Sequence, residues 1–445
     1  MCLRQGGCAL GKRRETNFLP EEAGLKRNPQ DLLSVEQALE NLLANIKPLP
    51  TEEIPLRDAL GRVLARKIRA QDDIPSFDNS AMDGFAIQAQ DVHSANQQNP
   101  IALRIVGDIS AGSANLEPLK PGSAMRIMTG ALLPAGADSI VPVELTTDPG
   151  AMAEKALPST VLVTASVQPG AYVRRAGQDV RAGSDVLPKG HRLRPQDIGM
   201  LAAVGIPKPS VYRQPKIALL STGDELIDVS DALKPGLIRD SNTYSLAAAV
   251  EAVGAIPIRL GIAKDDRDML TNLLSQSVKA GVNLIISSAG VSMGAYDFVR
   301  SVVQSNGHLE FWRVNMRPGK PILFGTFKDI PIVGLPGNPV SALVTFEIFV
   351  RPVIERMSGR PGVMRLNMKA RLKHDLQSDG RESYLRARVE WAGDEYKAEL
   401  VGSQDSGILS SLVKANALII IPSGATSLAK GDTVEAWLFD ASGTN

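Results

Sequence analysis

Two loops of small and polar residues have the composition needed to approach an anionic ligand closely. Residues 221–225 (STGDE) follow a short apolar run, and residues 287–294 (SSAGVSMG) follow another. Small side chains let backbone N–H groups turn towards a ligand, as they do where a phosphate lies at a helix N-terminus. Glycine and serine also make ordinary turns, so either loop alone is equally consistent with a plain turn.

A third loop holds a lysine between two prolines. Residues 317–321 (RPGKP) stand directly before the apolar run 322–324, and Arg313 adds a further positive charge upstream. A run of positive charges such as this one usually forms a solvent-exposed basic surface. The prolines fix the backbone on both sides of Lys320, however, and an ordinary surface lysine gains nothing from rigid flanks. We therefore expect this loop to bind an anion.

Residues 334–341 (GLPGNPVS) join an expected strand to a long helix. Asn338 is a natural N-cap, and Pro339 suits the first helical position. Capping is worth only about 1 kcal/mol, and it accounts for the asparagine but not for the glycine-rich approach. An oxyanion bound at the start of this helix accounts for both.

Four acidic residues fall on the same expected rim of the sheet: Asp224, Glu225, Asp265 and Asp297. Taken singly, Asp265 is a candidate cap for the helix expected at 269–278, and Asp297 fits the first turn of the next helix. Carboxylates that crowd together repel each other unless a cation balances them. Hard oxygen ligands beside a phosphorylated substrate are typical of Mg²⁺.

Residues 78–86 (DNSAMDGFA) form another polar cluster, well outside these loops. Short polar residues without apolar alternation indicate either an ordered functional loop or a plain cluster of Asx turns. The four histidines of the chain lie in unrelated contexts. Their scatter argues against a histidine metal site or a Ser/His triad.

The composition of the 445-residue chain suits a globular enzyme of roughly three or four domains. Forty-nine basic and 48 acidic residues leave a net charge of +1 without a long block of either sign, so we expect no nucleic-acid partner. The two cysteines, Cys2 and Cys8, lie in an N-terminal tail, which argues against a disulfide framework or a structural zinc site. No apolar segment is long enough for a signal peptide or a membrane span, and we expect a soluble cytoplasmic protein.

An open α/β sheet is needed to position the loops described above. Apolar strand-like runs alternate with helical periodicities from about residue 214 to 360, which predicts parallel strands with helices on both faces. Ligands bind beyond the carboxyl ends of the strands in such sheets. The last part of the chain is strand-like again and suits a small β-barrel.

The first half of the chain predicts a different arrangement. Residues 1–30 read as a disordered tail, and a capping box at Ser34 and Gln37 begins a first helix. A β-rich stretch follows, and helical periodicity returns after Pro195. If the second helix packs on the first, the β-rich stretch is an insertion into a discontinuous domain.

Taken together, the motifs resemble the molybdopterin molybdenumtransferases, the MoeA-like enzymes that include the C-terminal domain of gephyrin. The set is specific because the matching segments span nearly the whole chain after the tail and occur in the family's order. They are 77–86 (FDNSAMDGFA), 126–130 (RIMTG), 174–180 (RRAGQDV), 221–226 (STGDEL), 288–297 (SAGVSMGAYD), 317–321 (RPGKP) and 334–341 (GLPGNPVS).

The resemblance implies a multidomain fold of α/β and β type. It predicts an elongated discontinuous first domain, an inserted β-rich domain, an α/β domain of the molybdopterin-binding type with a mostly parallel sheet, and a C-terminal β-barrel. It also implies a homodimer, with each active site between the α/β domain of one subunit and the inserted domain of the other. We place the four domains at 31–74 with 174–213, at 75–173, at 214–360 and at 366–445.

The reaction implied is the insertion of molybdate into adenylylated molybdopterin, with Mg²⁺-dependent release of AMP, to give the molybdenum cofactor. Implied protein partners are a molybdopterin adenylyltransferase and apo-molybdoenzymes. The resemblance assigns catalytic roles to Asp83, Asp179, Glu225, Asp265, Asp297 and Lys320, with Glu225, Asp265 and Asp297 as metal ligands. Together with the loop composition, it assigns substrate contacts to Thr129, Ser221, Thr222, Gly223, Asp224, Gly290, Ser292, Gly294, Arg313, Arg317, Pro318, Gly319, Gly337, Asn338, Ser341, Arg386 and Ser406.

The sequence departs from the family pattern at a few positions. Ala289 stands where glycine is common, Ala295 stands where glutamate is frequent, and arginine replaces lysine at 313 and 317. Ala295 removes a possible acid, which weakens the metal assignment of its neighbours. Three alternatives remain open: a molybdopterin adenylyltransferase, which does not need the inserted domain; a gephyrin-like scaffold, which requires a peptide-binding groove; and a tungstate-selective homologue.

Overall fold

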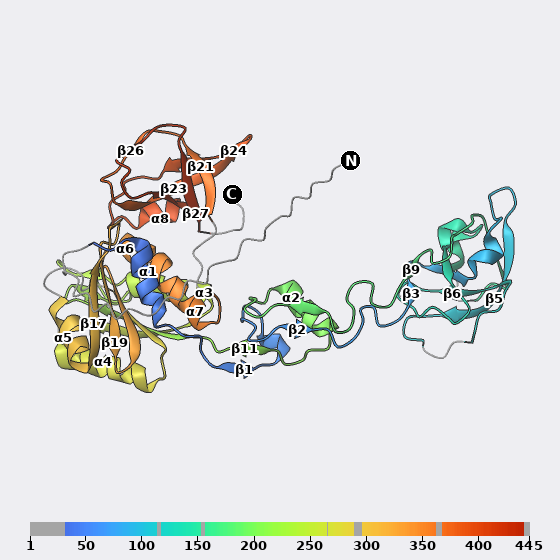
Figure 1. Ribbon diagram of the computed structural model, residues 1–445, viewed down its shortest axis with the longest axis horizontal. Helices are drawn as coiled ribbons and strands as arrows, with labels where there is room; N and C mark the ends of the chain where they lie inside the picture. Colours follow the sequence, from blue (N-terminus) through green and yellow to red (C-terminus); the bar gives the residue numbers. More distant parts are fainter. Residues whose placement is uncertain are drawn as a thin grey trace, which may run out of the picture.

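The computed structural model describes residues 32–113, 117–152, 156–264, 266–288, 296–361 and 367–439. Figure 1 shows an elongated molecule in which an α/β domain and a β-barrel lie together at one end, a β domain lies at the other, and a narrow unit joins them. The tail expected to be disordered, residues 1–30, lies outside the described residues. No helix in the described ranges is long and apolar enough to cross a membrane.

A six-stranded sheet forms the centre of the α/β domain, in the order β15-β12-β16-β20-β19-β17. The first four strands are parallel, whereas β19 and β17 continue the sheet as antiparallel neighbours. The expected mostly parallel sheet is therefore confirmed. Its strands are β12 (Lys216–Thr222), β15 (Ile256–Ala263), β16 (Leu284–Ser288), β17 (Gly307–Arg313), β19 (Pro321–Phe327) and β20 (Ile330–Leu335).

Helices cover both faces of this sheet because alternate residues of each strand point to opposite sides. Ile217 and Leu219 of β12 lie in one core, together with residues of α1, α3, α6 and α7. Ala218 and Leu220 lie in the other core, with residues of α4 and α5. These helices are α1 (Val35–Ala44), α3 (Asn242–Val253), α4 (Arg267–Lys279), α5 (Tyr296–Asn306), α6 (Pro339–Thr345) and α7 (Arg351–Met357), and the π-helical turn η5 (Phe346–Val350) joins the last two.

Helix α1 begins at the predicted capping box. Gln37 N donates to Ser34 Oγ, and Ser34 N donates to Gln37 Oε1, both at 3.1 Å. The apolar residues of α1 lie in the core of the α/β domain, whereas Leu201 of α2 lies in a separate core. The two helices therefore lie in different cores, and α1 packs against α7 instead.

Two short antiparallel pairings build the narrow unit, β1 with β11 and β2 with β10. Helix α2 begins at Pro195, as expected, and packs in the core of this unit. Each pairing joins a segment that precedes the far β domain to a segment that follows it. The elements are β1 (Thr51–Glu53), β2 (Ile68–Arg69), β10 (Asp185–Leu187), α2 (Pro195–Ala203) and β11 (Ser210–Tyr212).

The far β domain contains a five-stranded sheet in the order β7-β4-β6-β5-β8. Residues of its strands lie in two apolar cores. The short pair of β3 and β9 belongs to the same end of the molecule (Figure 1). The strands are β3 (Asn79–Ser80), β4 (Gly84–Ile87), β5 (Ile101–Ile109), β6 (Ser123–Ile127), β7 (Ser139–Pro142), β8 (Thr160–Val163) and β9 (Val173–Arg174).

The C-terminal domain is the expected β-barrel. Strands β23-β24-β21-β27-β25 pair in this order, and β25 pairs back with β23 to close the barrel. Tyr384, Leu418 and Trp437 of the barrel lie in the same core as α1 and α7, so the barrel packs firmly on the α/β domain. The strands are β21 (Asn367–Leu372), β23 (Glu382–Ala392), β24 (Glu395–Leu400), β25 (Ala417–Ile421) and β27 (Thr433–Leu438).

Two expected helix caps differ in the structure. The cap of α4 is Asp266, whose Oδ1 accepts hydrogen bonds from Asp268 N at 2.8 Å and Met269 N at 3.0 Å. Asp265 was expected to be this cap and lies outside the described residues. Asn338 occupies the N-cap position of α6, but its side chain makes no capping hydrogen bond.

Candidate active site

A cavity of about 650 Å³ lies where the carboxyl edge of the α/β sheet meets the β-barrel. Because β19 runs antiparallel to β20, the loop before β19 reaches the same edge as the loops after β12 and β20. Ten of the predicted contact and catalytic residues line this cavity together. They are Thr222, Glu225, Arg317, Pro318, Gly319, Lys320, Gly337, Asn338, Ser341 and Ser406.

Asn242, at the start of α3, ties together the α/β wall of the cavity. Its Nδ2 donates to Ser288 Oγ at 2.8 Å and to Gly337 O at 2.7 Å. Its Oδ1 and the Oγ1 of Thr222 are buried and have no hydrogen-bond partner in the described parts of the chain. Buried polar atoms normally have partners, so these two atoms mark places where a ligand or water would bond.

Gly319 lets the lysine loop, residues 317–321, approach α6 closely. Its φ of +106° favours glycine, and a Cβ at this position would collide with the Cγ2 of Thr345. Thr345 is itself fixed, since its buried hydroxyl donates to Ser341 O at 2.7 Å. The glycine therefore sets the position of the neighbouring Lys320, which is exposed to the cavity.

The barrel contributes a second cation and an acid that restrains it. Asp379 Oδ2 accepts a hydrogen bond from Arg381 Nη2 at 2.5 Å and lies 3.7 Å from Nη1 of Arg317. The hydrogen bond from Arg381, supported by the charge of Arg317, holds the pKa of Asp379 below its ordinary value. One carboxylate thus keeps two guanidinium groups side by side at the cavity.

Arg386 supports the cavity from behind. It is completely buried, and its Nη2 donates to Ser403 O at 3.1 Å and to Asp405 O at 3.0 Å. Burial lowers the pKa of its guanidinium, and the nearby charge of Arg317 acts in the same direction. Arg386 was predicted to contact the substrate, and it does not line the cavity; instead it holds the loop that does.

Asn338 and Ser406 connect the two walls. Asn338 Nδ2 donates to Ser406 Oγ at 2.7 Å, and Val340 N donates to Ser406 O at 3.2 Å. The side chain of Asn338 reaches across to the barrel instead of back to its own helix, which explains why the expected cap is missing. The carbonyl oxygen of Ser406 accepts a hydrogen bond from Val340 N, which belongs to the first turn of α6 and has no partner within the helix.

Several predicted residues lie outside the cavity. Ser221 is buried, and its hydroxyl donates to Asp240 Oδ1 at 3.0 Å. Gly223 makes a turn at φ +144°, while Asp224 and Arg313 are exposed but do not line the cavity. The side chain of Asp297 is not described by the structure. Four more predicted residues lie outside the described residues: Asp265, Gly290, Ser292 and Gly294.

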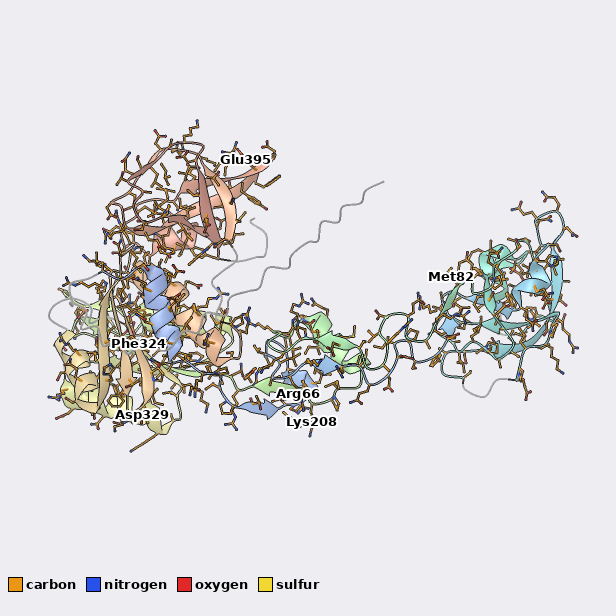
Figure 2. All side chains as sticks on the ribbon, viewed as in Figure 1. Arg66, Met82, Lys208, Phe324, Asp329 and Glu395 are labelled. Atoms are coloured by element: carbon orange, nitrogen blue, oxygen red, sulfur yellow. The ribbon has the colours of Figure 1, made fainter. Side chains whose placement is uncertain are left out.

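Asp83 and Thr129 lie at the opposite end of the molecule. Both are exposed residues of the far β domain, and Figure 2 shows the neighbouring Met82 far from Phe324 of β19. Asp179 is exposed on the return connection, where its backbone N–H donates to Ile74 O at 2.9 Å. These three residues therefore cannot reach the cavity of their own chain in this arrangement.

The carboxylates at the cavity are compatible with Mg²⁺ but do not form a complete protein cage. Glu225 and Asp405 line the cavity, and within the described residues no group of three or more metal-binding side chains occurs. Mg²⁺ is usually held by one or two carboxylates, substrate phosphates and water. The described residues thus fit a metal that arrives with a phosphorylated ligand.

Four polar residues that line the cavity were not predicted: Asn242, Arg381, Gln404 and Asp405. The last three come from the barrel, and sequence patterns do not show how a barrel docks on its neighbour. The only local signal was the Asp-Gly-Arg turn at 379–381, which is typical of many surface turns.

Comparison with known proteins agrees with this architecture. Residues 33–205 match the MoeA N-terminal region (domain I and II), residues 218–356 a probable molybdopterin binding domain, and residues 369–439 the MoeA C-terminal region (domain IV). The molybdopterin molybdenumtransferase of Nostoc sp. is 39% identical over 88% of this chain and 91% of its own length. That of Haemophilus influenzae is 33% identical over 91% of this chain and 98% of its own.

A solved structure gives the same result. The molybdopterin biosynthesis MoeA protein of Pyrococcus horikosii has a TM-score of 0.75 and 33% identity, covering 92% of this chain and all of the other. Fold and cavity thus define a multidomain enzyme of the MoeA type. The chain belongs to the molybdopterin molybdenumtransferase family, which confirms the resemblance first seen in its motifs.

Proposed function

We propose that this chain inserts molybdate into adenylylated molybdopterin and releases AMP, giving the molybdenum cofactor. The observation that carries the proposal is the cavity in which Arg317, Lys320 and Arg381 face the loops after β12 and β20. Cations in a partly enclosed site neutralise the charge that develops when a phosphoanhydride is cleaved. A volume of about 650 Å³ accommodates a ligand the size of a nucleotide.

The working enzyme, in this proposal, is a homodimer. The far β domain, which carries Asp83 and Thr129, lies at the opposite end of the chain from the α/β domain and the barrel that form the cavity (Figure 1). In a two-fold dimer, the far β domain of one subunit can lie over the cavity of the other, and the arrangement then repeats by symmetry. The elongated shape in Figure 1 supports this proposal, because the two half-sites are held apart within one chain.

The division of roles follows the chemistry of each side chain. Lys320 and Arg317 hold phosphate or molybdate oxygens, while the small residues Gly319 and Gly337 let the backbone come close. Mg²⁺, when bound, supplies positive charge that polarises the phosphoryl group. In the proposed metal site, Glu225 is the ligand that lines the cavity, and Asp265 and Asp297 are the other two ligands.

The proposed surroundings of the reaction are cytoplasmic. A molybdopterin adenylyltransferase would supply the adenylylated substrate, and apo-molybdoenzymes would accept the product.

Two substitutions test the proposed function. Asp83→Asn removes the exposed charge of the far β domain, and Lys320→Ala removes a cation from the cavity; each should abolish AMP release. Lys328→Ala is a matched control, because Lys328 follows the opposite end of β19 and its Nζ donates to Ser275 Oγ at 3.0 Å. Full turnover by purified, folded Asp83→Asn or Lys320→Ala protein would contradict the assignment.

A further inference from the structure

Asp78 lies where the chain enters the far β domain, and its carboxylate contacts the segment by which the chain leaves that domain. Asp78 Oδ1 accepts a hydrogen bond from Ala176 N at 2.8 Å, and Oδ2 accepts one from Arg175 Nη1 at 2.6 Å. The hydrogen bond from Ala176 N lowers the pKa of Asp78 below its ordinary value, and the ion pair with Arg175 acts in the same direction. A charged carboxylate thus joins two segments that are 98 positions apart in the sequence.

The segment that Asp78 holds also carries Asp179, one of the proposed catalytic acids. The N–H of Asp179 donates to Ile74 O at 2.9 Å, and Gly177 N donates to Pro75 O at 2.9 Å. Backbone bonds therefore join the entering and leaving segments as far as Pro75, and the side chain of Asp78 makes the next contact towards the far β domain.

The backbone of Asp78 holds the loop that carries Thr129. Leu133 N donates to Asp78 O at 2.9 Å. The N and Oγ1 of Thr129 in turn donate to Asp83 Oδ1 at 2.7 and 2.8 Å. Asp78 is thus bonded on one side to the segment of Asp179 and on the other side to the loop that fixes Asp83.

The two hydrogen bonds of the Asp78 carboxylate restrain different parts of the molecule. The side chain of Arg175 is 55% exposed, and exposed ion pairs contribute little because water screens the charges and the arginine can turn into solvent. The bond from Ala176 N starts from the main chain and therefore fixes the path of the backbone that leads to Asp179. Oδ1 of Asp78 is accordingly the atom that restrains this segment.

We propose that Asp78 is a positioning residue for the reaction and that its Oδ1 sets the place of Asp179 relative to Asp83 and Thr129. The inference rests on the proposed function, in which these three residues belong to one half of the active site. Asp78 does not need to touch the substrate for this role. Position matters because a displacement of about 1 Å in a catalytic group can cost about a hundredfold in rate.

Turnover by the full chain is the first test. Asp78→Ala removes both hydrogen bonds, and we expect kcat to fall by about tenfold or more, with little change in KM. Asp78→Asn keeps an oxygen for Ala176 N and should return kcat close to the wild-type value. Low kcat in both variants would show that the charge of Asp78 itself is needed, and it would overturn the positioning role. Wild-type kcat in Asp78→Ala, or a change confined to KM, would overturn it as well.

Arg175→Gln separates the ion pair from the backbone hydrogen bond. It removes the partner of Oδ2 and leaves the bond between Oδ1 and Ala176 N in place. We expect kcat to stay close to the wild-type value. A loss of kcat as large as that of Asp78→Ala would assign the effect to the ion pair and overturn the role of Oδ1.

Amide hydrogen exchange gives a second readout that does not depend on turnover. Asp78→Ala should speed exchange in peptides that cover residues 174–180, because local opening of this segment no longer breaks the bond to Ala176 N. Asp78→Asn should exchange at close to the wild-type rate. Unchanged exchange in Asp78→Ala would overturn the inference.

Asp91→Ala is the matched control. Asp91 Oδ2 accepts a hydrogen bond from Gly122 N at 2.7 Å in the same domain. Gly122 directly precedes β6, whose opposite end leads to Thr129. The variant loses a comparable bond and should keep the wild-type kcat. An equal loss of kcat in Asp91→Ala and Asp78→Ala would show general loosening of the domain and overturn the inference.

A purely stabilising role of Asp78 predicts a different temperature dependence. Thermal unfolding identifies a temperature well below the transition of each variant, and kcat is measured there. A positioning role predicts that kcat of Asp78→Ala stays low in this fully folded protein. Recovery of the wild-type kcat on cooling would overturn it.

Failure of the proposed function would give its own pattern. Wild-type protein that forms no cofactor would contradict the proposed reaction, whereas faster exchange in Asp78→Ala but not in Asp78→Asn would still support the restraint by Oδ1. Wild-type turnover together with an unchanged kcat in Asp78→Ala would support the reaction and overturn the inference.

Discussion

Asp83 and Thr129 are joined by two hydrogen bonds to one carboxylate oxygen. Thr129 N and Oγ1 lie 2.7 and 2.8 Å from Asp83 Oδ1. Both bonds favour the charged form, and they lower the pKa of Asp83 below its ordinary value. Since the pair lies on the exposed far β domain, a fixed negative charge is presented to whatever covers that surface.

Removing the hydroxyl of Thr129 should shift the pH dependence of the reaction. Thr129→Val deletes one of the two hydrogen bonds and keeps the backbone N–H, so the pKa of Asp83 should rise part of the way towards its usual value. If the charged form is active, the acid limb of the pH–rate profile moves to higher pH. Thr160→Val, on β8 of the same domain, is the control. An acid limb that stays in place would show that Asp83 does not act as a carboxylate.

Mixed dimers test whether one site is built from two subunits. Asp83→Asn and Lys320→Ala are each expected to be inactive, but a dimer with one copy of each contains one site in which both residues are intact. Random assembly of equal amounts should restore about a quarter of the wild-type sites in a two-fold dimer. AMP release by the co-expressed mixture is the measurement. No recovery, with mixed dimers shown to form, would place both residues in the same subunit's site or outside the site.

Gly319→Ala should destabilise the protein and weaken substrate binding. The alanine meets both an unfavourable φ of +106° and a collision with Thr345, and we expect a loss of at least about 1 kcal/mol. Gly393→Ala isolates the cost of the backbone angle, because Gly393 has a φ of +79° and open space around it. Adding Thr345→Ser, which removes the colliding methyl group, should restore part of the loss. Equal unfolding free energies for the two alanine variants would contradict the close-approach argument.

The contact between Asn338 and Ser406 should couple the α/β domain to the barrel. A double-mutant cycle of Asn338→Ala and Ser406→Ala should give a coupling energy of about 1 kcal/mol in unfolding measurements, typical of one hydrogen bond. Both single variants should also raise KM, because the two residues line the cavity. Additive effects in the cycle would show that the 2.7 Å hydrogen bond does not contribute to the free energy of unfolding.

Much of the α/β domain was predictable because buried strands and amphipathic helices leave clear periods in a sequence. The apolar runs that precede the loops 221–225 and 287–294 lie in β12 and β16, and Pro339 began α6 as expected. The antiparallel strands β17 and β19 were harder, since no period distinguishes an antiparallel neighbour from a parallel one. The last part of the chain was predicted to be strand-like, and it forms the strands of the barrel, including Ala417–Ile421.

The candidate site was predictable only where one loop carried its own signal. Proline and glycine marked residues 317–321 and residues 334–341 as unusual loops in the sequence, and residues of both loops line the cavity. Arg381 lay in a turn of a common type and Asn242 gave no local signal, because the place of both residues in the site arises from contacts between distant segments. Asn338 illustrates the same limit: its sequence position predicts a cap, but the nearby barrel offers Ser406 as a competing partner.

The most direct measurement is AMP release by the purified full chain, incubated with adenylylated molybdopterin and Mg²⁺, in the presence and absence of molybdate. The product is then tested for its ability to reconstitute an apo-molybdoenzyme. We predict AMP release that depends on molybdate and a product that restores activity to the apo-enzyme. No molybdate-dependent AMP, from protein that is folded and binds the substrate, would contradict the proposed reaction.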